Sequence, residues 1–144
     1  MILTTYFRVK LTKNLLEHKR TIQVLTVFWT GLVAYLCLAS SESLPSVSVF
    51  KFDKIGHLTF HFGITITWFL FWKTTYRNEN KYALLKAFLF SFFFGVVIEL
   101  FQGWFTETRC SDIEDVVANT FGAFIAVVVI FICSKIKSKS SQFN

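Results

Sequence analysis

The sequence contains little that would interrupt a helix, and its cysteines are few and irregularly spaced. One proline and six glycines occur in 144 residues, so the apolar content must lie in long uninterrupted elements. Cys37, Cys110 and Cys133 lack the spacing of zinc ligands, and no HExxH or serine or cysteine nucleophile motif is present. We therefore expect no metal and no cofactor. A disulfide between Cys37 and Cys110 stays an open alternative, because both are expected toward one side.

Long stretches of the chain also lack charge. Ile22–Ala39, Ile55–Trp72 and Val116–Cys133 each contain 18 residues without Asp, Glu, Lys or Arg, and Ala87–Phe105 contains 19 with Glu99 as the single charge. At about 1.5 Å per residue, a helix of this length reaches roughly 27 Å, close to a hydrocarbon core of about 30 Å. Helices in soluble cores are rarely so long and so free of charge. The sequence therefore predicts membrane spans.

The predicted fold class is all-α, an integral membrane bundle of four transmembrane helices in a single domain. The domain covers residues 22–133, between a basic N-terminal segment, 1–21, and a basic tail, 134–144; its spans are about 22–39, 55–72, 87–105 and 113–133. A cleaved signal peptide is disfavoured, because the first apolar run is long and three more follow it. The first 20 residues fit either a helix lying on the membrane or a disordered segment.

The basic residues predict the orientation of the chain. Twelve of the 15 lysines and arginines precede the first span, flank the second connection or lie in the tail. By the positive-inside rule both termini are cytoplasmic, in a multi-pass protein of the inner (cytoplasmic) membrane. The net charge of +6 is thus a topology signal, and we expect no nucleic-acid partner. Seven of the nine acidic residues fall in or near the outer half.

Polar residues gather where the second, third and fourth predicted spans reach the outer surface. Three of them, His61, Glu99 and Asn119, lie six residues inside their helix ends, or about 9 Å deep. Helical spacing places each helix's polar residues on one face. The candidate functional residues are Asp53, Lys54, His57, Glu99, Gln102, Arg109, Asp115 and Asn119.

Two glycines are predicted to bring these helices close together. Gly95 shares a stripe with Glu99, and Gly122 lies in a small-residue stripe beside Asp115 and Asn119. Small residues permit close helix packing in membranes. The same contact allows a structural interpretation, in which Gln102 and Asn119 only form hydrogen bonds between helices.

Glu99 is harder to explain by packing alone. An ionised carboxylate inside the hydrocarbon is costly unless it is wet or paired, here with Arg109, Lys54 or a protonated His57. The His57-xxx-His61 pair has metal-ligand geometry, which Glu99 or Asp115 could complete, but we expect no metal in the absence of a denser motif. Glu99 is therefore a candidate for function.

These motifs, in this order, resemble the VanZ-like family. The resemblance rests on Asp53-Lys54-x-x-His57, Glu99-x-x-Gln102, Arg109 and Asp115-x-x-x-Asn119-x-x-Gly122, and it runs from about Leu44 through Gly122. It implies a small multi-helix bacterial membrane protein of the cell envelope, whose named member is linked to teicoplanin resistance. His61 departs from the family, which more often has an aromatic residue there, and this further weakens a two-histidine metal site.

Two classes of function follow from the polar cluster. In the first, the chain binds an envelope lipid, a lipid-linked precursor or an amphiphile: Arg109, Lys54 and His57 hold phosphate or carboxylate, and the remaining polar residues accept hydroxyls. In the second, the chain is an enzyme acting on a lipid headgroup, with Glu99 or His57 as general acid or base. A transporter is less favoured, because the inner halves of the spans are apolar. A thin four-helix bundle also makes a homodimer plausible.

Overall fold

The computed structural model describes the backbone of residues 2–38, 49–105 and 112–140, and the side chains of residues 16–38, 54–104 and 112–136. This part of the chain is helical, which confirms the predicted all-α class. Its helices are α1 (Ile2–Leu38), α2 (Val49–Tyr76), α3 (Asn80–Phe105) and α4 (Ile113–Ser140). Helices α2, α3 and α4 each contain one predicted span, and α1 covers the first span as far as Leu38; each helix extends beyond its span with polar residues.

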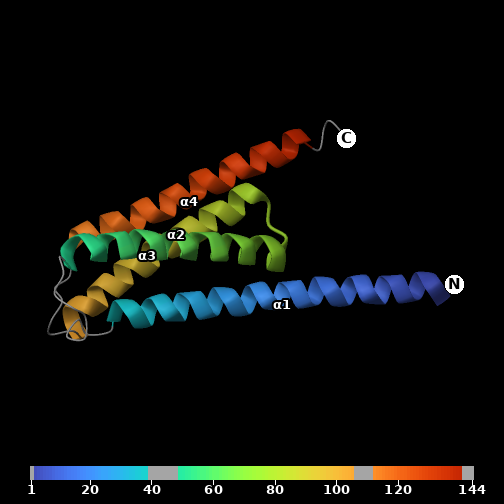
Figure 1. Cartoon of the computed structure of the whole chain (residues 1–144), viewed down its shortest axis with the longest axis horizontal. Helices are drawn as coiled ribbons and strands as arrows, with labels where there is room; N and C mark the ends of the chain where they lie inside the picture. Colours follow the sequence, from blue (N-terminus) through green and yellow to red (C-terminus); the bar gives the residue numbers. More distant parts are fainter. Residues whose placement is uncertain (1, 39–48, 106–111, 141–144) are drawn as a thin grey trace.

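The helices form a bundle around α2. Figure 1 shows α1 and α4 on opposite sides of α2, with α3 crossing behind it, and α2 packs against all three others. We call the end of the bundle where α2 begins, α3 ends and α4 begins the polar end, and the opposite end the basic end. At the basic end a short connection, residues 77–79, joins α2 to α3. Arg77 stops α2 with a positive φ of 52°.

Helix α1 is one continuous element of 37 residues. At about 1.5 Å per residue it extends roughly 55 Å, well beyond a hydrocarbon core of about 30 Å. The N-terminal segment is therefore neither a separate surface helix nor an irregular one; from Ile2 onward it prolongs the first predicted span. The indole of Trp29 ties α1 to α2 by donating a hydrogen bond to the Phe60 carbonyl at 3.3 Å.

Among the described residues, three helices are long and apolar enough to cross a membrane: Leu16–Leu38 of α1, Asn80–Trp104 of α3 and Ile113–Ile136 of α4. Large apolar side chains such as Val27, Phe93 and Phe131 are exposed on the bundle, as expected for helices that face lipid. The prediction of apolar spans is confirmed for these three. Helix α2 forms over the second predicted span, but it carries buried histidines and threonines and is not among these three helices. That α2 also crosses the membrane is part of the proposal below.

Candidate functional site

The polar end contains a buried cluster centred on His57 of α2. Glu99 of α3 and Asp115 of α4 face this imidazole from two sides: Nδ1 lies 3.7 Å from Glu99 Oε1, and Nε2 lies 4.0 Å from Asp115 Oδ2. The carboxamide oxygen of Asn119, one turn after Asp115, lies 3.1 Å from Nδ1. Three helices thus bring together four of the predicted site residues, which we call the His57 cluster.

The cluster is enclosed on most sides. His57 and Glu99 are each 2% exposed and Asn119 is 1% exposed, whereas Asp115 retains 8%. Asp115 is thus the member nearest to solvent, in the first turn of α4. Burial of two carboxylates within 4.0 Å of one imidazole is costly to maintain and is typical of a functional site.

Glycines make the close approach of these helices possible. A Cβ on Gly122 of α4 would overlap the carbonyl oxygen of Leu58 in α2, so the two backbones touch beside His57. A Cβ on Gly95 of α3 would lie 2.9 Å from His61 Cε1 and 3.1 Å from Asn119 Nδ2. Both glycines thus occupy the packing positions predicted for them, directly against the site.

His61 lies one turn beyond His57 but has a different partner. Its Nδ1 lies 2.9 Å from the hydroxyl of Ser91 in α3, and it is not among the residues whose ligand atoms converge on His57. The two histidines of α2 thus face different neighbours, Asn119 of α4 and Ser91 of α3. Ser91 lies one helical turn before Gly95 and is buried, and its contact with His61 could not be read from the sequence.

Gln102 links α3 to α1. Its amide nitrogen donates a hydrogen bond to the Cys37 carbonyl at 2.7 Å, and Gln102 is 2% exposed. This hydrogen bond joins two helices, as the structural interpretation of Gln102 expects.

Lys54 of α2 lies at the polar end and is partly exposed. It forms an ion pair with Glu114 and lies 3.9 Å from Asp112. Asp112 caps α4, because its Oδ1 accepts a hydrogen bond from the Glu114 amide at 2.9 Å. Arg109, Cys110 and the side chain of Asp53 lie outside the described residues, so their predicted roles stay predictions.

A comparison of the sequence with models of protein families gives a match. The model of the VanZ/LLP1 family matches residues 2–134 of the chain. The chain belongs to the VanZ/LLP1 family. Searches of the curated proteins and of the solved structures found no match. Membership of VanZ/LLP1 confirms the resemblance and, with three apolar helices, indicates a multi-pass membrane protein.

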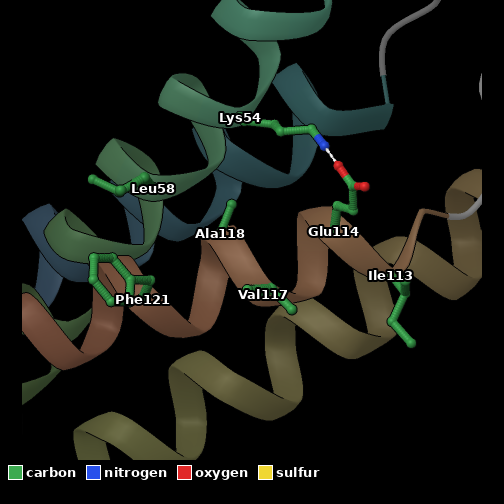
Figure 2. Close-up of a pocket in the computed structure, with 7 residues that line it drawn as sticks. All are labelled: Lys54, Leu58, Ile113, Glu114, Val117, Ala118 and Phe121. Carbon is green, nitrogen blue, oxygen red and sulfur yellow. Dashed lines mark ion pairs between the residues drawn. The ribbon is translucent and has the colours of Figure 1, made fainter.

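An apolar groove lies on the surface of this VanZ/LLP1 bundle, at the polar end. It has a volume of about 420 Å³ and runs between α2 and α4. Figure 2 shows Lys54 and Glu114 paired at one end of it and Phe121 toward the other. Its walls are Leu58, Ile113, Val117, Ala118 and Phe121. Leu58 and Ala118 adjoin His57 and Asn119 in sequence, so the groove and the cluster are built from neighbouring positions of α2 and α4.

Proposed function

We propose that this VanZ/LLP1 protein crosses the bacterial inner membrane four times and binds an amphiphilic envelope lipid or lipid-linked precursor at its polar end. The observation that carries the proposal is that a buried cluster of ionisable residues and an apolar groove of about 420 Å³ lie at the same end of the bundle. The groove fits an acyl or prenyl chain, and the ionisable residues beside it fit a polar headgroup. A binding site for an amphiphile needs both an apolar surface for the chain and polar groups for the headgroup.

The charge distribution supports an outward-facing polar end. Lys73 and Lys81 lie at the opposite, basic end, where Asn80 accepts a hydrogen bond from Lys73 at 2.5 Å and approaches Ser134 of α4 at 3.4 Å. Gln23 of α1 reaches the same end, 3.5 Å from the Thr75 hydroxyl. The N-terminal segment, the α2–α3 connection and the tail thus share one side, which by the positive-inside rule is cytoplasmic.

The headgroup site would combine cations with acceptors. Positive charge for phosphate or carboxylate would come from three residues. These are Lys54 at the groove, His57 behind it, and Arg109 in the connection between α3 and α4. Asp115 and the other acceptors of the His57 cluster would receive hydroxyl or amine groups. In this arrangement the ion pair of Lys54 with Glu114 exchanges for contacts to the headgroup.

The test is native mass spectrometry of the detergent-purified protein, reading co-purified lipid. We expect wild type to retain a specific lipid class, and Arg109→Ala and Glu99→Gln to lose it. Lys135→Ala, at the basic end, is the control for a lost surface cation and should retain the lipid. Equal, nonspecific lipid in all four proteins, with unchanged helical content, would overturn the proposal.

An enzymatic version is favoured by one observation, the 3.7 Å approach of His57 Nδ1 and Glu99 Oε1, which suits proton transfer to or from a bound headgroup. Incubation of purified protein with labelled envelope lipids separates the two versions. Turnover that Glu99→Gln abolishes indicates an enzyme; retention without turnover indicates binding alone. A role in glycopeptide susceptibility would appear as a raised inhibitory concentration of teicoplanin on expression, lost in the same variant.

A further inference from the structure

We propose that His57, Glu99 and Asp115 form a binding site for a divalent transition-metal ion of the Zn²⁺ or Mn²⁺ class. Each of the three offers one ligand atom, and these atoms all lie within 4.8 Å of one another. Ligands at about 2.0–2.2 Å from a common ion lie roughly 3–4.4 Å apart, so small side-chain rotations close the site. Imidazole nitrogen and carboxylate oxygen are ligands that zinc and manganese accept.

Asn119 prepares His57 for this role. Its carboxamide oxygen lies 3.1 Å from Nδ1 and accepts a hydrogen bond from an N–H there. The lone pair of the neutral ring is then on Nε2, the nitrogen that faces Asp115 Oδ2 at 4.0 Å, whereas Glu99 faces Nδ1 at 3.7 Å and must rotate toward Nε2 to join the site. In this state the ion, and not a protonated His57, supplies the positive charge. Metal-binding histidines are characteristically oriented in this way, with the second ring nitrogen donating to an oxygen outside the coordination sphere.

Two buried polar atoms beside the cluster point independently to a bound species. Within the described part of the chain, His61 Nε2 and Asn119 Nδ2 have no hydrogen-bond partner, although both residues are only 1% exposed. Both side chains lie against Gly95, one helical turn before Glu99. Buried polar groups are almost always satisfied, and a water coordinated to the ion would supply a donor and an acceptor at this place.

The same geometry offers an entry path for the ion and an electrostatic stabilisation of the bound ion. The side chain of Asp115 is 11% exposed, against 2% for His57 and Glu99, so an ion would enter at the first turn of α4. A divalent cation would balance the charge of two carboxylates that lie within apolar helices. Such compensation is strongest where water is scarce.

The experiment measures metal retained by the full-length protein. The protein is stripped with a chelator in detergent, incubated with Zn²⁺ or with Mn²⁺ and desalted, and its metal is measured by inductively coupled plasma mass spectrometry. We expect about one ion per chain in wild type, and at least a tenfold lower affinity in Asp115→Asn and Glu99→Gln, which keep side-chain shape but lose charge. Glu114→Gln, the neighbouring exposed acid, is the matched control and should retain the ion.

A spectroscopic measurement keeps the proposal testable if a variant folds poorly. Co²⁺ added to stripped wild type should give visible absorption bands whose intensity follows a 1:1 titration and which Zn²⁺ displaces. Wild type should also gain thermal stability with rising Zn²⁺, as a ligand that binds only the native state requires. Absence of both stoichiometric retention and the cobalt spectrum in folded wild type would overturn the site, as would equal retention in Asp115→Asn.

Discussion

At the scale of single residues, ionisable side chains in apolar segments were the informative signal. His57, Glu99, Asp115 and Asn119 could be predicted as one group because their spacing places them on helix faces at similar depth, and the structure brings them together. Their individual partners could not be predicted, because a pair such as His61 and Ser91 depends on the rotation of each helix about its axis. A serine in a stripe of small residues gives no such information.

The glycines permit a direct test at this scale. In Gly122→Ala the added Cβ would overlap the backbone of Leu58, which cannot rotate away as a side chain could. We expect α2 and α4 to separate locally, at a cost of about 1–3 kcal/mol or more. Thermal unfolding in detergent, followed by circular dichroism, would show a lowered Tm.

Gly31→Ala is the matched control, because a Cβ at Gly31 meets nothing within 4 Å. Alanine there should leave the Tm unchanged or raise it slightly, since it favours the helix by up to about 1 kcal/mol. If the two variants unfold at the same temperature, the close contact of α2 and α4 at Leu58 is wrong.

At the scale of helices, the apolar runs located every element but underestimated each length. The predicted spans mark only the segments that lack charge, whereas α1 and α4 continue into basic flanks that contain no helix breaker. The polarity of α2 has a simple physical reason: it packs against the three other helices, so His57 and His61 meet Asn119 of α4 and Ser91 of α3, while Thr65 donates a hydrogen bond to a carbonyl of its own helix. A hydropathy pattern cannot show which helix is central.

The N-terminal cap of α4 can be tested by substitution. Asp112→Ala removes the capping bond to the Glu114 amide, and we expect a loss of about 1 kcal/mol and fraying of the turn that holds Asp115. Hydrogen exchange measured by mass spectrometry should be faster in the first turn of α4 and unchanged at its centre. Asp112→Asn, which keeps the cap but loses the charge beside Lys54, should exchange like wild type; faster exchange there would assign the effect to the ion pair instead.

At the scale of the whole molecule, one end of the bundle carries the His57 cluster and the other carries basic residues. The side of the membrane that the polar end faces decides from which compartment a ligand would bind. Cysteine labelling in intact bacterial cells tests this orientation. In a background with Cys37, Cys110 and Cys133 replaced by alanine, Glu114→Cys reports on the polar end and Glu79→Cys on the basic end, because both native side chains are exposed at 63% and 70%.

The positive-inside rule predicts opposite results for the two positions. A membrane-impermeant maleimide should label Glu114→Cys in intact cells and should label Glu79→Cys only after the cells are permeabilised. Labelling of both positions after permeabilisation controls for local accessibility. The reverse pattern would place the His57 cluster on the cytoplasmic side, where a cytoplasmic ligand would replace an envelope lipid. Equal labelling in intact cells would mean that α3, the helix that joins the two positions, does not separate them across the membrane, and would contradict its apolar, span-length character.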